Sequence, residues 1–211
     1  MELGKVRRAR TRAKIIAAAF ELFGNEEGLY ARIEEVVRRA GITRTTFYDH
    51  FSGMPELREA VTYEVTHDFQ TSVTYTVSLL DDARERAAAA IRFYLHRVRE
   101  VPGWGWSMIN LSANGIIFGA ETFRHAELTV VEAIASGKLA ITDSALGRDC
   151  ILGTTIAAIS TMLRQSKDED YPEKVAETIL VGLGVPAAEA REIANRALPA
   201  LATPEAGRNP T

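Results

Sequence analysis

Cysteine is almost absent from this chain of 211 residues, which contains only Cys150. A single thiol cannot form an internal disulfide, and it excludes a zinc site built from several cysteines. The four histidines never recur at the spacing of one helical turn, and none lies at metal-ligand spacing from the cysteine. We therefore expect no metal and no cofactor, and we interpret Cys150 as a packing residue.

Long apolar runs are also missing. No stretch approaches the ~18 consecutive apolar residues of a membrane helix, and the N-terminus lacks the apolar core of a signal peptide. With 46% hydrophobic residues the composition is that of a globular protein, which we predict to be cytoplasmic and without a membrane partner. Serine nucleophile elbows, phosphate loops and dinucleotide fingerprints are absent, so we predict no catalytic residues and expect no enzyme.

Sustained alternation of β-branched residues, the pattern of strands, does not occur. Apolar residues instead recur at helical spacing, and Pro and Gly mark a turn at residues 102–105. The sequence therefore predicts an all-α fold, with helices over residues 11–23, 33–40, 44–51, 55–80, 83–101, 106–113, 120–136, 144–164, 171–183 and 186–198.

The segment over residues 33–51 is the most informative part of the chain. An apolar face on residues 33–40 is followed by Gly41, at a helix end where positive φ is needed and only glycine adopts it cheaply. Thr43 is a good N-cap for a second short helix, in which Phe47 and Phe51 would point inward. This pattern predicts two short helices joined by a tight glycine turn.

Hydroxyl, aromatic and basic side chains occupy the other faces of the second helix. Such side chains hydrogen-bond phosphates and base edges, and a helix that presents them fits the major groove of DNA. An ordinary helical hairpin with a polar face is the alternative. The DNA-contacting residues predicted in this segment are Thr43, Arg44, Thr45, Thr46, Tyr48 and His50.

Positive charge gathers near the N-terminus although the net charge is only −3. Residues 1–50 hold ten Lys and Arg against seven Asp and Glu, a net of +3, and residues 51–211 hold fifteen against twenty-one, a net of −6. Local rather than global charge sets the attraction for phosphates. We therefore predict that Arg10 and Arg12, in the basic arm over residues 5–14, contact DNA; a solvated helix start is the alternative.

Residues 11–60 resemble the DNA-binding domain of the TetR family of bacterial transcriptional repressors. The matching pieces are residues 16–23, residues 35–51, and Glu56 with Leu57. The resemblance implies a three-helix helix-turn-helix domain over residues 1–50, which would bind a double-stranded DNA operator. It further implies a larger helical ligand-binding and dimerisation domain over residues 51–202. Residues 203–211 are expected to form a disordered tail.

Two places depart from the family pattern. Ala31 and Arg32 stand where the family usually carries a Ser or Thr that caps the second helix and touches a phosphate. Met54 stands near the position at which the family usually has a Lys. We expect Arg32 to supply one of the missing phosphate contacts.

The resemblance also implies a homodimer, in which the helices over residues 144–164 and 171–183 of two subunits form a four-helix bundle. Small residues at helical spacing in the first helix allow close approach, and the second carries an apolar stripe. Packing of that stripe within one chain is the alternative. The predicted dimer residues are Leu146, Cys150, Gly153, Thr154, Ala157, Thr161, Ile179 and Leu183.

Aromatic residues concentrate in the middle of the chain, where the resemblance implies a cavity. An apolar cavity with a few polar groups is a ligand pocket, and residues that simply fill the core are the alternative. Because arginines are dispersed here, an apolar or aromatic ligand is favoured over a polyanion. The predicted ligand-binding residues are Phe93, Trp104, Trp106, Met108, Asn110, Asn114, Phe118, Phe123 and His125.

Together these features predict a ligand-responsive transcriptional repressor that a small apolar or aromatic molecule releases from a palindromic operator. Two alternative functions belong to other classes of protein: a small helical enzyme, and a structural DNA-binding protein without an effector. The enzyme would need a nucleophile–base pair or a metal cluster. The structural protein would have a filled body without a cavity.

Overall fold

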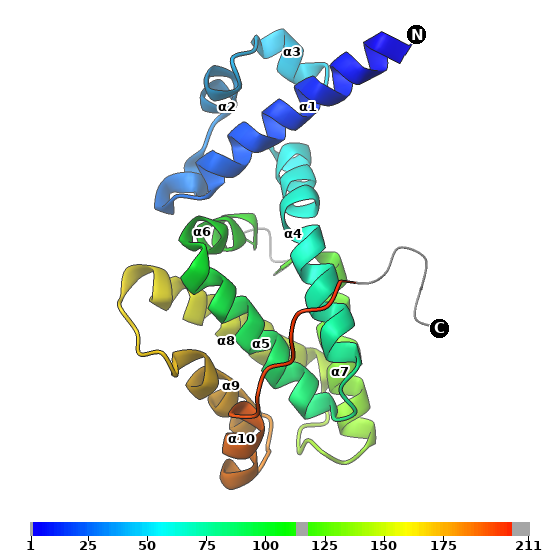
Figure 1. Cartoon of the computed structure of the whole chain (residues 1–211), viewed down its shortest axis with the longest axis vertical. Helices are drawn as coiled ribbons and strands as arrows, with labels where there is room; N and C mark the ends of the chain where they lie inside the picture. The colour runs from blue at the N-terminus through cyan, green and yellow to red at the C-terminus, as the bar shows by residue number, and fades with distance from the viewer. Residues whose placement is uncertain (1, 113–117, 204–211) are drawn as a thin grey trace.

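The computed structural model describes residues 2–112 and 118–203. Over these ranges the regular structure is helical and no strand occurs, which confirms the predicted all-α class. A small head of three α-helices and a short 3₁₀ helix lies at one end, and a larger helical body lies at the other (Figure 1). Of the tail predicted at residues 203–211, all but residue 203 lies outside the described residues.

The head is built from α1 (Glu2–Phe23), η1 (Glu26–Tyr30), α2 (Ile33–Ala40) and α3 (Arg44–Tyr48). The start of α1 predicted at residue 11 is wrong, because the basic arm continues the helix back to Glu2. Its Arg, Lys and Ala residues are strong helix formers, which explains the extension. The 3₁₀ turn η1 has no counterpart among the predicted elements. Fully buried side chains from three helices form the head core: Ile15, Ala19, Phe23, Val36 and Phe47.

One long helix, α4 (Met54–Ser78), runs from the head into the body (Figure 1). Near its start Leu57 and Val61 are completely buried, and further along Val73 belongs to the same continuous apolar core. The helix begins with Met54 and Pro55, because proline at the first positions of a helix removes only an N–H that has no helical partner. Head and body are therefore connected by uninterrupted helix rather than by a flexible linker.

The body surrounds α5, whose apolar side chains face neighbours on several sides. The turn predicted at residues 102–105 is wrong, since Pro102 occupies the first turn of α6 and the helix continues through Gly105. A Cβ on Gly105 would lie 2.9 Å from Val98 Cγ1, so glycine permits α6 to approach α5 closely. The helices of the body are α5 (Ala83–Glu100), α6 (Pro102–Leu111), α7 (Ala120–Ala135), α8 (Ser144–Arg164), α9 (Tyr171–Gly182) and α10 (Ala187–Ala194). No described helix is both long and apolar enough to cross a membrane.

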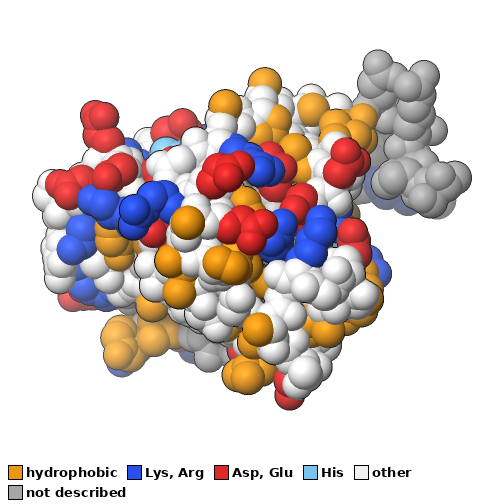
Figure 2. Space-filling view, turned by 90° about the horizontal axis from the view of Figure 1, so that it is seen from below, with side chains coloured by type: hydrophobic (Ala, Val, Ile, Leu, Met, Phe, Trp, Pro, Cys, Tyr) orange, Lys and Arg blue, Asp and Glu red, His pale blue; other side chains and the backbone are white. Residues whose placement is uncertain are grey.

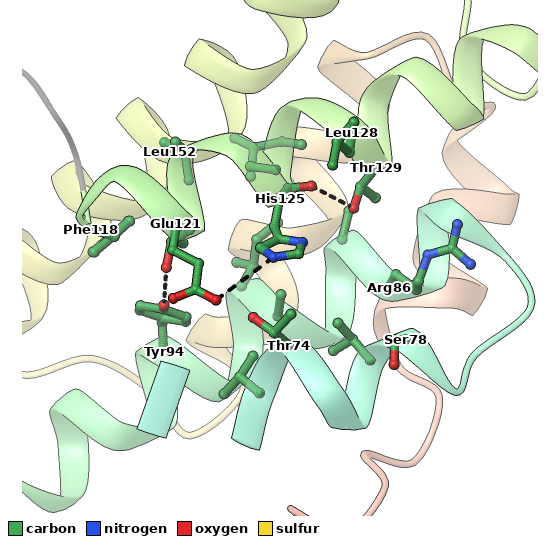
Figure 3. Close-up of a pocket in the computed structure, with 18 of the residues that line it drawn as sticks. Thr74, Ser78, Arg86, Tyr94, Phe118, Glu121, His125, Leu128, Thr129 and Leu152 are labelled. Atoms are coloured by element: carbon green, nitrogen blue, oxygen red, sulfur yellow. Dashed lines mark hydrogen bonds and ion pairs between the residues drawn. The ribbon is translucent and has the colours of Figure 1, made fainter. Parts of the chain in front are cut away.

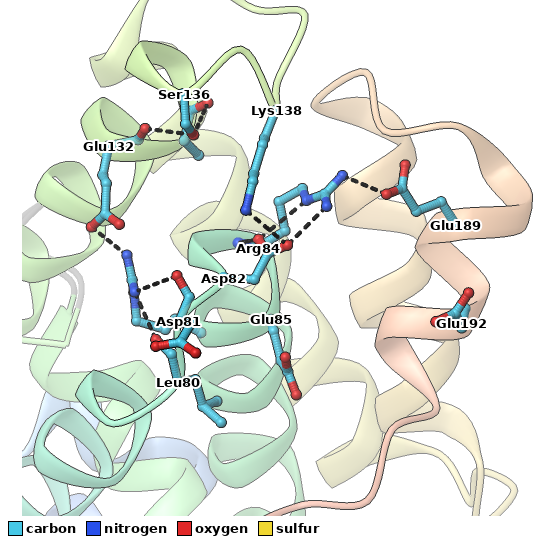
Figure 4. A network of polar contacts seen from close by, with 12 residues as sticks. Leu80, Asp81, Asp82, Arg84, Glu85, Glu132, Ser136, Lys138, Glu189 and Glu192 are labelled. Carbon is cyan, nitrogen blue, oxygen red and sulfur yellow. Dashed lines mark hydrogen bonds and ion pairs between the residues drawn. The ribbon is translucent and has the colours of Figure 1, made fainter.

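An ion-pair network stabilises the end of the body that lies farther from the head (Figure 4). Asp82 caps α5 by accepting a 2.9 Å hydrogen bond from the backbone N–H of Arg84, and its carboxylate pairs with Arg84 Nη2 at 2.8 Å and Lys138 Nζ at 3.1 Å. Arg84 Nη1 reaches Glu189 Oε1 on α10 at 2.8 Å. Acidic and basic side chains lie side by side across this end of the molecule (Figure 2). Hydrogen bonding from Arg84 holds the pKa of Asp82 far below its usual value.

Asp82→Asn should lower the free energy of unfolding at neutral pH by about 1–3 kcal/mol, because asparagine keeps the cap but removes the paired charge. The folded-state pKa of Asp82 is lowered, so its contribution is complete above the ordinary aspartate pKa and is lost as the pH falls through the folded value. Urea unfolding at stepped pH should show a constant difference from wild type above pH ~5, shrinking progressively below pH ~4.

The matched control is Asp81→Asn, which alters the neighbouring exposed carboxylate and should change stability little at any pH. A difference between wild type and Asp82→Asn that stays the same down to pH ~2 would contradict the prediction.

Candidate functional site

The turn between α2 and α3 has the geometry that the sequence predicts. Gly41 ends α2 with φ 63° and ψ 42°, the left-handed conformation that glycine adopts at little cost. The backbone N–H groups of Gly41 and Ile42 donate to the carbonyls of Arg38 and Val37 at 3.3 and 3.1 Å. These bonds close the end of α2 and set the direction in which α3 leaves.

α3 is short, and its N-terminus is capped. The hydroxyl of Thr43 accepts a 3.1 Å hydrogen bond from the backbone N–H of Thr46, and the two threonine hydroxyls lie 2.9 Å apart. Phe47 and the following Phe51 are buried in the head core, as their spacing predicts. This anchoring leaves the polar side of α3 free: Thr43, Arg44, Thr45 and Tyr48 are exposed, and Thr46 and His50 are half-buried.

Arg44 lies over its own helix and next to α2. Its Nη1 is 3.0 Å from Glu34 Oε1, and its guanidinium lies 5.8 Å from the centre of the Tyr48 ring. Both charged side chains are about two-thirds exposed, at 64% for Arg44 and 60% for Glu34. An exposed pair of this kind contributes little to stability, so the guanidinium can exchange Glu34 for another hydrogen-bond acceptor.

The predicted residues of the arm and of α2 lie in different surroundings. Arg10 is exposed on α1. Arg12 forms an ion pair with Glu64 of α4, and its guanidinium lies 5.2 Å from the centre of the Phe51 ring, so this side chain links α1 to α4. Arg32 is exposed directly before α2, and its backbone N–H donates to Glu35 Oε2 at 2.8 Å.

A polar joint connects the head to the body. Asn110 on α6, a predicted ligand residue, instead donates 2.8 Å hydrogen bonds to the carbonyls of Phe23 and Asn25. Arg58 on α4 donates to the carbonyls of Asn110 at 3.1 Å and Leu29 at 2.7 Å, and its guanidinium lies 4.5 Å from the centre of the Phe23 ring. Burial lowers the pKa of Arg58. No local pattern in the sequence marks Arg58, since its partners are backbone carbonyls far away in the chain.

The joint is tight because of Gly28. A Cβ at this position would lie 2.6 Å from the carbonyl oxygen of Leu22 and 2.7 Å from Asn110 Nδ2. Neither distance can accommodate a side chain, so the 3₁₀ turn η1 packs directly against α6. Arg58 Nη2 also reaches the Gly28 carbonyl at 3.4 Å.

A cavity of about 730 Å³ lies in the body between α4, α5, α7 and α8 (Figure 3). This size falls within the range of ligand pockets in proteins. Its inner wall is formed by Ile91, Tyr94 and Leu152, and its rim by exposed residues such as Leu128 and Glu132. The cavity therefore reaches the surface between the C-terminal half of α4 and α7.

The polar groups of the cavity gather where α7 begins. Tyr94 Oη is 3.3 Å from Thr122 Oγ1, and His125 Nε2 is 4.0 Å from Glu121 Oε1. Burial raises the pKa of Tyr94 to about 12 and lowers the pKa of His125. Phe118 closes this end with φ 61°, a conformation that is uncommon for a residue other than glycine, and its carbonyl accepts a 2.6 Å hydrogen bond from Gln70 Nε2.

The cavity wall includes two of the predicted ligand residues, Phe118 and His125. The others lie elsewhere, and those on α6 do so because this helix starts at Pro102 and packs against α5, α8 and the head. Phe93, Trp104 and Met108 are buried in the core, with Trp104 packed edge-on against Phe69. The side chains of Trp106 and Phe123 lie under Arg164 and Arg148 respectively, Asn110 belongs to the joint, and Asn114 is outside the described residues.

The predicted dimer residues divide into two groups. Leu146 and Ala157 are exposed on α8, and Cys150, Gly153, Thr154 and Thr161 are half-buried on the same helix. Ile179 and Leu183, by contrast, are buried within the single chain, at 1% and 2% exposure. Their burial agrees with the alternative interpretation, in which this stripe packs within one chain. On α9 the exposed apolar residue is Val181, which is not among the residues predicted from the sequence.

The head and the body together define a helix-turn-helix DNA-binding regulator with a cavity in its second domain. Residues 15–61 match the family model of bacterial regulatory proteins of the TetR family, and residues 82–196 match that of the tetracyclin repressor-like C-terminal domain. These two matches cover most of the chain, which belongs to the TetR family. The resemblance inferred from the sequence is thus confirmed.

Two curated relatives from Pseudomonas putida match over 64 residues, which is 30% of this chain, at 36% identity. They are the HTH-type transcriptional regulator SrpR and the uncharacterized HTH-type transcriptional regulator TtgW. The match spans 30% of SrpR and 48% of TtgW, less than half the length of either.

Solved structures match over nearly the whole chain. RolR in complex with resorcinol is 29% identical with a TM-score of 0.75, and the match covers 94% of this chain and 100% of RolR. The regulator FadR from Bacillus subtilis in complex with stearoyl-CoA is 18% identical with a TM-score of 0.64, covering 81% of this chain and 96% of FadR, and it shows the fold alone.

Arg44→Ala should weaken specific DNA binding by ~1–3 kcal/mol, the size expected for a lost bidentate contact with guanine. The measurement is a mobility-shift titration at fixed salt on an operator selected from random DNA. Glu34→Gln is the matched control: it removes the ion-pair partner of Arg44 without removing the cation, so affinity should stay equal or rise. Equal affinities of wild type and Arg44→Ala would exclude Arg44 from the interface.

Proposed function

We propose that this protein is a transcriptional repressor that binds a palindromic operator as a homodimer and is released by a small molecule. The observation that carries the proposal is the continuity of α4, which packs against α1 of the head and contributes Thr74 to the cavity wall. One rigid element thus touches both the DNA-binding head and a cavity of ligand size. A cavity also favours an effector-responsive regulator over a structural DNA-binding protein without an effector.

An aromatic effector is the best-supported class. RolR, whose structure holds resorcinol, is 29% identical over 94% of this chain. The cavity in this chain has aromatic side chains in its wall, among them Tyr75, Tyr94 and Phe118. Aromatic rings pack favourably on one another in offset or edge-to-face arrangements.

Release from DNA follows from a shift between two populations. Two α3 helices must be ~34–36 Å apart to enter successive major grooves of a palindromic site. An effector shifts the equilibrium only by binding more tightly to the form with the wrong spacing. Because α4 lines the cavity, a ligand that pushes α4 away from α7 would also reposition the head.

The proposal is tested by selecting an operator from random DNA and titrating the protein–operator complex with resorcinol and with larger aromatic molecules. We expect the selected sites to be palindromic and at least one aromatic molecule to release the DNA over the range in which it binds the protein. Selected sites without two-fold symmetry, or a complex that no cavity ligand dissociates, would contradict the proposal.

The homodimer requires the exposed side of α8, and Gly153 offers a sharp test of it. A Cβ added to Gly153 would meet nothing within 4 Å beyond the neighbouring backbone of its own helix, so the single chain can accept a side chain there. Gly153→Arg should therefore leave the fold intact but introduce a charge into the dimer interface, where an unpaired cation is strongly unfavourable. Sedimentation should show a monomer, and operator affinity should fall by more than about tenfold, since two heads no longer bind together.

Ala188→Arg is the control, because Ala188 is exposed on α10, outside the predicted interface. It should remain dimeric with unchanged operator affinity. If the Gly153→Arg protein sediments as a dimer, α8 does not form the dimer interface.

A further inference from the structure

The cavity has two chemically different ends. Its inner end is buried, with Tyr94 at 5% exposure and Leu152 and Thr155 at 4% and 3%. Its exposed parts carry the charged groups: Glu121 lies beside His125, and Arg86 lies toward the opposite end of the cavity (Figure 3), where it pairs with Glu132. A ligand that fills the cavity must therefore leave any charge at the rim, because an unpaired buried charge is very unfavourable.

The rim does not favour an anion. Arg86 forms an ion pair with Glu132, and its Nη1 donates hydrogen bonds to the carbonyls of Leu80 at 2.8 Å and Asp81 at 3.3 Å, so its positive charge is already paired. Glu121 adds a second carboxylate to the cavity wall, 4.0 Å from His125 Nε2. The described wall thus presents two carboxylates and one occupied guanidinium, an arrangement that repels negative charge.

Two hydroxyls and an imidazole form the polar group at the start of α7, and the exposed carboxylate of Glu121 lies beside them, with its Oε1 4.0 Å from His125 Nε2. The hydroxyls of Tyr94 and Thr122 lie 3.3 Å apart, and the imidazole of His125 faces the cavity from the next turn of α7 (Figure 3). Burial keeps the proton on Tyr94 and favours the neutral form of His125, because the pKa of the first is raised and that of the second is lowered. A neutral imidazole has one nitrogen that accepts a hydrogen bond, and a tyrosine hydroxyl both donates and accepts.

The volume distinguishes between small and large aromatic molecules. A cavity of about 730 Å³ corresponds to roughly two dozen water molecules at about 30 Å³ each. A single ring with two hydroxyls, such as resorcinol, would leave apolar wall residues including Val77 and Leu128 without a partner. Contacts of these side chains with a longer ligand would add both dispersion and apolar burial.

We propose that the effector is an uncharged hydroxylated aromatic molecule longer than a single ring. Its hydroxyl bonds to Tyr94, Thr122 and His125 at the inner end, and its apolar remainder lies along α4 toward Leu128. This inference rests on the proposed function in one respect, which is that the cavity is the site where the effector binds.

Calorimetric titration of the full-length protein with three related probes tests the proposal. The probes are resorcinol, its longer uncharged analogue 4-hexylresorcinol, and the anion 2,4-dihydroxybenzoate. We expect 4-hexylresorcinol to bind at least about tenfold more tightly than resorcinol, and the benzoate to show no saturable binding. Equal affinities for resorcinol and its hexyl analogue, or tighter binding of the benzoate, would overturn the proposal.

Two variants show whether the probe occupies the cavity. Tyr94→Phe removes only the inner hydroxyl and should weaken the binding of 4-hexylresorcinol by about tenfold. The control Tyr63→Phe changes an exposed tyrosine on α4 and should leave this affinity unchanged. Ala126→Phe fills the cavity from α7 and should abolish binding. Unchanged affinity in both Tyr94→Phe and Ala126→Phe would show that the probe binds elsewhere and would overturn the proposal.

Operator release is measured separately, so that the two proposals can fail independently. If 4-hexylresorcinol binds as expected but never dissociates the operator complex, the ligand class stands and the proposed function fails. If the three probes do not bind while an anionic or smaller molecule releases the operator, the function stands and the ligand class fails.

Discussion

The hydrogen bonds between Arg58, Asn110 and the backbone of η1 and α1 hold the head in a fixed orientation on the body. Five bonds from two side chains converge on carbonyls of residues 23, 25, 28, 29 and 110. Hydrogen bonds from a charged donor such as Arg58 contribute more than neutral ones, and a buried partner left without its bond is costly. A tilt of the head on the body would therefore have to break several of these bonds at once or carry α6 along.

The same constraint connects the joint to the cavity through α6. Trp104, six residues before Asn110, packs against Tyr94 with ring centres 5.7 Å apart, and Tyr94 in turn lies 4.8 Å from Phe118 at the inner end of the cavity. These aromatic residues are close-packed, and a tightly packed core responds to a small displacement by moving as a unit. A ligand against Tyr94 and Phe118 is thus within two side-chain contacts of the helix that holds the head.

Local signals let the sequence predict the head well and the cavity poorly. Gly41, Thr43 and the Phe47–Phe51 pair act on their immediate neighbours, so their spacing alone indicated the turn, the cap and the buried face. Asn110 and Trp104 were expected in the ligand site because of their residue types, yet their positions depend on where α6 starts. Proline is compatible both with a turn and with the first turn of a helix, so Pro102 alone does not distinguish them. The packing of α6 against α5 and η1 favours the helix. Arg58 carries no local signal because its partners are carbonyls brought near it by the fold.

The location of the cavity explains how a modest ligand can oppose the joint. Its opening separates α4 from α7, so a bound molecule acts on α4 well beyond Arg58, where the helix is held by apolar contacts rather than by the joint. Moving an equilibrium between two forms from 1:99 to 99:1 requires a difference in ligand affinity of about 10⁴ between them. A ligand that fills an apolar cavity can differ this much in its affinity for the two forms only if the cavity is completely closed in one of them. Phe118 borders that space with φ 61°, and its carbonyl accepts a hydrogen bond from Gln70 of α4, so this end of the cavity is tied to the helix that runs into the head.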